Sequence, residues 1–475
     1  MNRPKENTED DSSSSLAGPV TVAVLFGGAL LLLILALFGN KKSNNADDPS
    51  LEEQAEEIVK GKGKKVKSES AAAAAEKERE QRRAAAGQNQ KGKAKDTFAH
   101  PLLVTTLRGH TGEICDGDFS ANGKYFVTSS EDRSVHIWTC ADFLSDDPAK
   151  EIRHSRLNMD YDHAVLVRFS PDSKALLGRM NNDNVVRVLK LNKKPDGHYA
   201  GLQTVLDLPT TSHGEIVFMD INCNGKFIMT GYADTQICLW SLKGNLLATI
   251  VTNVATLHCA KVSPCGRFVA ASGFTPDVKV WEVNFEKSSG DFHSVERAFE
   301  LKGHSAGIPC FAFSGDSTHM VSLSKDKTFR LYDINVEYKK KQDARLIQDA
   351  IWTTEDVDVT STQVALSNDS RCIVIATKGN VSILSGVDGS VKAVIQSPLT
   401  GPIQKLMLDP SSGYIITIGG RLVRVFRNTI GYEITIATLK DKLTYATQDS
   451  ISQRLQQQLE DTQKVLSACK YHLTA

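Results

Sequence analysis

The 475-residue sequence has no CxxC pair among its nine cysteines, which are dispersed over positions 115, 140, 223, 238, 259, 265, 310, 372 and 469. Without paired ligand spacing, the sequence contains no zinc or redox motif. Several cysteines stand inside apolar runs, such as Cys238 in "QICLW" and Cys310 in "IPCFAF". We therefore expect buried free thiols in a reducing compartment, and no bound metal.

The sequence also lacks net charge, because 56 basic residues balance 56 acidic ones. This balance hides a local asymmetry, since residues 58–95 carry twelve Lys and Arg against four Glu, a net of +8. No GxSxG or HExxH pattern occurs, and "GKGKK" lacks the spacing of a phosphate-binding loop. The sequence therefore supports no enzyme and predicts no cofactor.

Charge is missing altogether between Asp11 and Lys41. Within this gap, Val20 to Phe38 reads "VTVAVLFGGALLLLILALF", and nineteen helical residues span about 28 Å, close to the thickness of a hydrocarbon core. The acidic N-terminal segment and the absence of a small-residue cleavage site favour an uncleaved anchor over a signal peptide. Because Lys41 and Lys42 follow directly, the positive-inside rule places the C-terminal side in the cytosol.

No folding pattern is visible in residues 40–98, which are acidic over 47–57 and basic over 58–95. We expect a disordered charged stalk. It is either a solvated spacer, a segment that touches anionic lipid, or a segment that contacts RNA phosphates. The basic residues that the RNA alternative would use are Lys60, Lys62, Lys64, Lys65, Lys67, Arg82 and Arg83.

Beyond residue 100 the sequence changes to short β-rich runs punctuated by Gly, Asn and Asp, and one pattern occurs three times. In each copy an Asp stands six residues before an aromatic residue, and a hydroxyl residue stands four before the Asp. A histidine precedes the aromatic residue by 28, 27 and 28 positions. The three sets are His110, Thr128, Asp132 and Trp138; His213, Thr230, Asp234 and Trp240; and His304, Ser322, Asp326 and Tyr332.

Weaker copies of the same unit lie between and after these three, and they end at Leu189, Trp281, Leu384 and Phe426. Each unit has a strand, a tight turn such as "SPDS", "SPCG" or "DPSSG", a second strand, a turn and a third strand. Trp281 is the end aromatic of unit 4, where Asp277 is only four residues away. The sequence therefore contains seven units, and repetition at this period indicates a repeat architecture.

These units resemble the WD40 repeat family over residues 102–427. The resemblance implies an all-β fold, a seven-bladed propeller of four-stranded blades, closed by the N-terminal strand Leu102 to Leu107. It also implies that the histidine, hydroxyl, Asp and tryptophan of a blade form a buried hydrogen-bonded tetrad. Tyr332 replaces the tryptophan in unit 5, and units 2, 4, 6 and 7 lack the full set. Since the histidines recur at one spacing, we interpret them as structural and not as catalytic triads.

A helix is predicted after the propeller, in "SISQRLQQQLEDTQKVLSACK", with Ser450 as N-cap. It either packs on its own propeller or forms a short coiled coil with a partner. Its narrow apolar stripe contains Ile451, Leu455, Leu459, Thr462 and Leu466. The predicted segments are residues 1–19 (short N-terminus), 20–39 (transmembrane helix), 40–98 (stalk), 99–428 (propeller) and 429–475 (helical tail).

This order of anchor, stalk, propeller and helix resembles WD40 proteins of the endoplasmic-reticulum membrane. The resemblance implies a non-enzymatic scaffold with a cytosolic propeller and C-terminus, linked to the stress-activated translation-initiation-factor kinase of that membrane and to translational control. The alternative from the residues themselves is an RNA- or ribosome-binding adaptor that acts through the basic stalk.

Overall fold

The computed structural model describes residues 98–145, 150–194, 198–446 and 449–474. The predicted N-terminal segment, the transmembrane helix, the stalk up to residue 97 and its basic residues lie outside the described residues. Within the described ranges, no helix combines the length and the apolar character needed to cross a membrane. Residues 97–475 form one compact unit.

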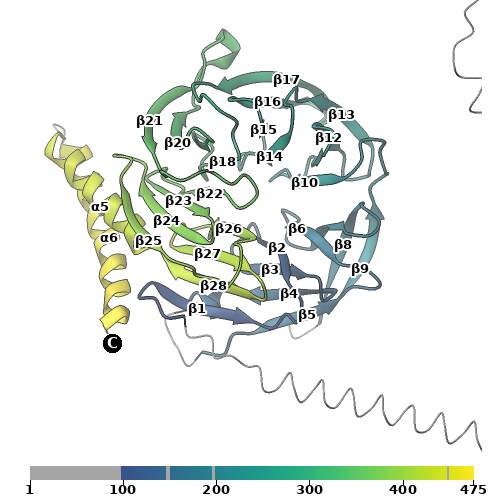
Figure 1. Ribbon diagram of the computed structural model, residues 1–475, viewed down its shortest axis with the longest axis horizontal. Coiled ribbons are helices and arrows are strands. Elements are labelled where there is room, and N and C mark those ends of the chain that lie inside the picture. The colour runs from purple at the N-terminus through teal and green to yellow at the C-terminus, as the bar shows by residue number, and fades with distance from the viewer. Residues whose placement is uncertain (1–97, 146–149, 195–197, 447–448, 475) are drawn as a thin grey trace, which may run out of the picture. The chain divides into compact units, whose positions relative to one another are not determined.

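In the described part of the chain, seven four-stranded sheets surround a common axis (Figure 1), which confirms the predicted seven-bladed propeller. Blades 1 to 3 contain β2 (Ile114–Phe119), β3 (Tyr125–Ser130), β4 (Ser134–Thr139) and β5 (His154–Asn158); β6 (Ala164–Phe169), β7 (Ala175–Met180), β8 (Val186–Lys193) and β9 (Tyr199–Asp207); and β10 (Ile216–Ile221), β11 (Ile228–Tyr232), β12 (Gln236–Trp240) and β13 (Leu246–Val251). Blades 4 to 6 contain β14 (Leu257–Val262), β15 (Phe268–Gly273), β16 (Val278–Phe285) and β17 (Phe292–Leu301); β18 (Cys310–Phe313), β19 (His319–Leu323), β20 (Thr328–Asp333) and β21 (Arg345–Ile351); and β22 (Gln363–Leu366), β23 (Cys372–Thr377), β24 (Asn380–Ser385) and β25 (Val391–Ile395).

Blade 7 combines the two ends of the propeller sequence. Its strands are β26 (Lys405–Leu408), β27 (Tyr414–Gly419), β28 (Leu422–Arg427) and, at the outer edge, β1 (Leu103–Arg108). β1 runs antiparallel to β28, with Leu107 opposite Val423. The N-terminal strand therefore closes the ring, as the sequence predicts.

The hydrophobic core is divided into seven clusters of buried residues, one between each pair of neighbouring blades. Trp138 of blade 1 packs with Ile416 of blade 7, and Trp240 of blade 3 packs with Leu177 of blade 2. Because each blade is covered only by its neighbours, burial depends on a complete ring. The end residues of all seven predicted units pack in this way against the preceding blade: Trp138, Leu189, Trp240, Trp281, Tyr332, Leu384 and Phe426.

The turn between the first two strands of a blade follows one design throughout. A polar residue, buried in six of the seven blades, begins the turn; Ser367 Oγ accepts from Cys372 N at 3.0 Å, and Asp409 Oδ1 accepts from Tyr414 N at 2.7 Å. Three residues after it, the backbone is left-handed, a conformation that favours glycine. The left-handed residues are Gly123, Ser173, Gly225, Gly266, Ser317, Ser370 and Ser412, with φ between 57° and 71°.

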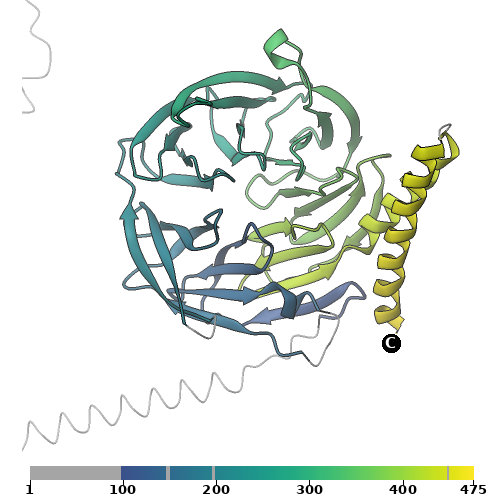
Figure 2. The same ribbon diagram turned by 180° about the vertical axis from the view of Figure 1, so that it is seen from behind.

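In the part of the chain that the structure describes, four helical elements accompany the strands: α4 (Cys140–Phe143), the 3₁₀ helix η1 (Tyr338–Lys340), α5 (Thr429–Thr444) and α6 (Asp449–Thr474). The two long helices lie together outside the ring, beside blade 6 (Figures 1 and 2). α5 was not expected from the sequence. Its N-terminus is capped by Asn428, whose Oδ1 accepts from Gly431 N at 3.0 Å.

The predicted C-terminal helix is α6, which begins one residue before the expected N-cap Ser450. It packs on α5, which in turn contacts β23 and β24. In the predicted stripe, Leu455, Leu459 and Leu466 are half-buried, whereas Ile451 is exposed. The apolar stripe is therefore partly covered within the chain, with α6 packed on α5 and Thr462 beside loop residues of blades 6 and 7.

Candidate functional site

The four residues of unit 1 form one hydrogen-bonded chain in blade 1. Trp138 Nε1 donates to Thr128 Oγ1 at 3.0 Å, His110 Nε2 lies 2.9 Å from the same oxygen, and His110 Nδ1 lies 3.1 Å from Asp132 Oδ2. Because a carboxylate only accepts, Nδ1 carries the proton of the neutral ring and Nε2 accepts from the threonine hydroxyl. Thr128 has no exposed surface, so its hydroxyl is closed to any substrate. The arrangement is suited to holding the blade together and not to nucleophilic chemistry.

Asp132 is the anchor of this chain. It also accepts from Thr111 N at 2.8 Å and from Ser134 Oγ at 2.5 Å. Burial alone would raise the pKa of Asp132, but the hydrogen bonds from Ser134, Thr111 and His110 together hold it well below its usual range. Burial lowers the pKa of His110, which favours the neutral ring that the hydrogen bonds require.

Blade 5 repeats the first three members and differs in the fourth. His304 Nδ1 lies 3.1 Å from Asp326 Oδ2, and His304 Nε2 lies 2.8 Å from Ser322 Oγ. The Tyr332 hydroxyl donates to the Lys302 carbonyl at 2.8 Å, because a phenol carries its donor further from the backbone than an indole does. The substitution therefore redirects the aromatic residue to the main chain while it remains buried.

In blade 3 the four predicted tetrad residues form two separate hydrogen-bonded pairs and not one chain. His213 Nδ1 lies 2.8 Å from Asp234 Oδ2, and Trp240 Nε1 donates to Thr230 Oγ1 at 2.8 Å. Tyr232 stands where blades 1 and 5 have a serine, and its ring centroid lies 5.3 Å from that of His213. The His213 side chain is 22% exposed, against 1% for His110 and 0% for His304. A bulky ring at this position accounts for the outward displacement of the histidine.

A stack of aromatic rings in blade 1 was missed in the sequence. His136 lies 3.8 Å from His110 and 4.9 Å from His154 between ring centroids, and Trp138 lies 4.4 Å from His154. Among the described residues, neither ring nitrogen of buried His136 has a hydrogen-bond partner. Burial, together with the charges of His110 and His154, lowers the pKa of His136 to about 3. The alternation of "SVHIW" places His136 two residues before Trp138, which was the available signal.

The inner strands carry a second polar network, around buried Asp116 of β2. One carboxylate oxygen lies 2.8 Å from Lys405 Nζ of blade 7, and the other lies 2.7 Å from an Arg168 nitrogen of blade 2. Burial would raise the pKa of Asp116, but the two cations outweigh it and lower the pKa. The Asp220 carboxylate lies 3.7 Å from Arg168 on the far side. These charges connect four blades around the axis.

Backbone amides of the next blade also bond to these inner side chains. Asp116 accepts from Val167 N at 3.1 Å and Asp118 accepts from Phe169 N at 2.8 Å. The same kind of bond recurs between two other pairs of blades. Asp220 of blade 3 accepts from Val262 N of blade 4, and Gln363 of blade 6 accepts from Leu406 N of blade 7. Since an innermost strand is an edge, these bonds satisfy amides that have no further strand to pair with.

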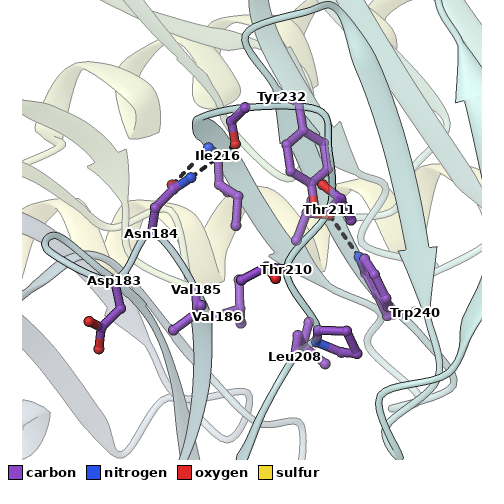
Figure 3. Close-up of a pocket in the computed structure, with 13 residues that line it drawn as sticks. Asp183, Asn184, Val185, Val186, Leu208, Thr210, Thr211, Ile216, Tyr232 and Trp240 are labelled. Carbon is purple, nitrogen blue, oxygen red and sulfur yellow. Dashed lines mark hydrogen bonds between the residues drawn. The ribbon is translucent and has the colours of Figure 1, made fainter. Parts of the chain in front are cut away.

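A small pocket lies between blades 2 and 3, next to the separated pairs of blade 3. Figure 3 shows Asp183, Asn184 and Ile216 on one side of it and Tyr232 and Trp240 on the other. In the described ranges, no group of three or more His, Cys, Asp or Glu side chains is arranged to hold a metal ion. Of the cysteines whose side chains the structure describes, all are free thiols, five of them buried and two, Cys223 and Cys265, exposed.

Comparison with known proteins agrees with this geometry. The family described as "WD domain, G-beta repeat" matches residues 102–139, 204–241 and 296–333. These ranges contain units 1, 3 and 5, the three units with complete sets of histidine, hydroxyl, aspartate and aromatic residues. WD40 propellers are typically non-enzymatic and bind proteins.

The chain is also similar to individual members of the family. It is 42% identical to transducin beta-like protein 2 of Mus musculus over 372 residues, which cover 78% of this chain and 83% of that protein. The protein of the same name from Homo sapiens is 42% identical over 371 residues, or 78% and 82% of the two chains. Nuclear distribution protein PAC1 of Arthroderma benhamiae is 23% identical over 276 residues, or 50% and 53%. The chain therefore belongs to the WD40 repeat family and, within it, to the family of transducin beta-like protein 2.

Proposed function

We propose that this protein is a membrane-tethered, non-enzymatic scaffold that presents its propeller to the cytosolic side of the endoplasmic reticulum. The observation that carries the proposal is the complete, closed seven-bladed ring, whose hydroxyl and histidine groups serve packing and leave its loops free for protein binding. The relationship to transducin beta-like protein 2 supports the same role. The apolar run Val20 to Phe38 supports the tether.

The partner class that we propose is the signalling machinery of endoplasmic-reticulum stress, including the stress-activated translation-initiation-factor kinase of that membrane. A tether raises the effective concentration of a scaffold near membrane-bound partners, so modest affinities suffice. The resemblance to WD40 proteins of the endoplasmic-reticulum membrane supports this partner.

The test uses the full-length chain with a proximity-labelling enzyme at its C-terminus. We expect it to resist alkaline carbonate extraction and to label cytosolic-side proteins of the endoplasmic reticulum, with the kinase more strongly labelled during stress. A matched variant without residues 20–38 should become extractable and lose this labelling. Recovery of the full-length chain in the extracted fraction would contradict the tether, and unchanged labelling without residues 20–38 would contradict its role.

A second function, RNA or ribosome binding through the stalk, is favoured by the net charge of +8 over residues 58–95. Binding through phosphates weakens steeply with salt, because each neutralised phosphate releases counterions. RNA capture by the full-length chain that falls with salt and disappears on deletion of 58–95 would support it. RNA capture that survives the deletion would place any RNA contact elsewhere.

A further inference from the structure

The pocket between blades 2 and 3 is walled by two loops and by residues of four strands. Asp183, Asn184 and Val186 come from the β7–β8 connection and the start of β8, and Leu208 to Thr211 come from the β9–β10 connection. Blade 3 contributes Ile216, Thr230, Tyr232 and Trp240 (Figure 3). The centres of water molecules can occupy about 50 Å³ of the pocket. That space holds about three to five waters, which together occupy about the volume of one aliphatic side chain.

The pocket exists because the tetrad of blade 3 is open. In blades 1 and 5 the histidine ring reaches the strand hydroxyl at 2.9 and 2.8 Å and fills this position. In blade 3 the ring has moved outward to Asp234, and Tyr232 and the Thr230–Trp240 pair form a wall. The histidine that fills this position in blades 1 and 5 therefore leaves it unfilled in blade 3.

The walls are fixed before any ligand binds. Asn184 Nδ2 donates to the Gly214 carbonyl at 2.9 Å, and Ile216 N donates to Asn184 Oδ1 at 3.0 Å (Figure 3). An Arg179 nitrogen beneath them lies 2.6 Å from Glu215 Oε1 and 3.3 Å from Asn184 Oδ1. These bonds join the two blades across the pocket, and a preformed site loses less entropy on binding.

The charges in and beside the lining are predominantly negative. Arg187 is bonded to both oxygens of Asp207 at 2.8 Å and to Asp183 at 3.3 Å. With histidine counted as neutral, the four carboxylates outnumber the two guanidinium groups, which leaves a net charge of −2. The carboxylates are those of Asp183, Asp207, Glu215 and Asp234, with 58%, 40%, 64% and 36% of their side chains exposed, and the guanidinium groups are those of Arg179 and Arg187.

We propose that this pocket is the docking point for a single lysine side chain of a partner protein. Leu208 and Ile216 line the pocket with apolar surface for the unbranched stem. Of the Asp183 carboxylate, Oδ2 lies 3.3 Å from Arg187, which leaves Oδ1 for the ammonium group. An arginine is less suitable, because its planar fork requires both oxygens of one carboxylate, and Arg187 already bonds to both oxygens of Asp207 and to one of Asp183. The inference rests on the proposed scaffold function and names the chemistry of one of its partners.

The test is saturation-transfer difference NMR on the full-length protein in detergent micelles, with the peptide Gly-Gly-Lys-Gly-Gly as probe. We expect saturation on the lysine methylene protons, and weaker saturation of peptides with norleucine or arginine at the central position. Equal saturation of the norleucine peptide would show that the ammonium charge does not contribute to binding, which would contradict the proposal. Stronger saturation of the arginine peptide would overturn the choice of lysine.

Two pairs of variants locate the binding. Thr210→Phe, which fills the pocket from an exposed lining position, should abolish lysine saturation, whereas Thr256→Phe on an exposed loop of blade 4 should not. Asp183→Asn should weaken lysine binding about 2- to 5-fold, whereas the exposed Asp160→Asn, with the same change of charge, should leave it unaltered. Equal effects within either pair would overturn the pocket. None of these outcomes depends on the membrane tether or on labelling in cells, so the pocket can fail while the scaffold function stands.

Discussion

Lys405 and Asp116 join the last blade to the first at the axis, with Lys405 Nζ 2.8 Å from Asp116 Oδ1 across 289 positions of sequence. The β1–β28 pairing joins the same two regions at the outer edge of blade 7. The ring is thus closed twice, once by backbone hydrogen bonds and once by an ion pair. Asp116 is 2% exposed and Lys405 23%, so water screens this pair only partly.

We expect Lys405→Met to destabilise the full-length protein by about 1–3 kcal/mol, since it leaves one oxygen of a buried carboxylate without its partner. Asp116→Asn should be destabilising as well, because it also weakens the bond to Arg168. Urea denaturation of the two single variants and the double variant gives their coupling energy. Strictly additive losses would show that the contact does not contribute to ring closure.

The tetrad of blade 1 predicts a graded series of aspartate variants. Asp132→Ala removes the acceptor of His110, Thr111 and Ser134 and should cost about 1–3 kcal/mol. Asp234→Ala, at the more exposed pair of blade 3, should cost less, and Asp183→Ala in the unit without a tetrad should cost least. Thermal unfolding of the three variants checks the order. An Asp183 loss equal to that of Asp132 would contradict the role of the tetrad.

Acid should destabilise blade 1 through His136. Its pKa is lowered to about 3 in the folded chain, against about 6.5 when unfolded, so the unfolded chain binds more protons between these values. The histidine's contribution to stability is therefore complete above about pH 6.5 and is lost as the pH falls toward 3. We expect the urea midpoint to fall between about pH 7 and pH 5, and to fall less in His136→Phe, which keeps the ring stack.

The matched control for this experiment is His293→Phe, at an exposed position. It should leave the pH dependence of the urea midpoint as in the unaltered protein. If His136→Phe and the unaltered protein respond equally to acid, the buried histidine is not the sensing group.

Orientation in the membrane predicts the absence of glycan at the sequons "NDS" of Asn368 and "NVS" of Asn380. A lumenal propeller would expose these acceptors to glycosylation, whereas a cytosolic one would not. The gel mobility of membrane-extracted protein should not change with endoglycosidase, and protease added to sealed microsomes should digest the propeller. An N-terminal tag with its own sequon serves as the positive control. A glycosylated, protease-protected propeller would reverse the proposed orientation.

The propeller could be predicted because its units repeat, and the closing strand because the resemblance to WD40 repeats implies that an N-terminal strand completes the last blade. Helix α5 could not. Its sequence "TIGYEITIATLKDKLT" is rich in β-branched residues, which disfavour a helix in isolation, so packing against blade 6 decides its structure. Only Asn428, the N-cap, was a local signal.

The opened tetrad of blade 3 depends on a position that the repeat pattern did not include. Blades 1 and 5 have Ser130 and Ser324 two residues after the strand hydroxyl, and each accepts from the amide of the tetrad aspartate. Blade 3 has Tyr232 there. The axis network was invisible for a different reason, because Asp116 and Lys405 come together only when the ring is closed.

The borrowed strand also sets an order for folding during synthesis. β1 is the first strand to be made, yet β28 ends at Arg427, 324 residues after Leu103. At about 5–20 residues per second, this distance takes roughly 16 to 65 seconds to translate. Throughout that time the nascent chain holds an unpaired strand and blades without their final neighbour. β1 therefore cannot take its place at the edge of blade 7 until the last strand of the propeller has been made.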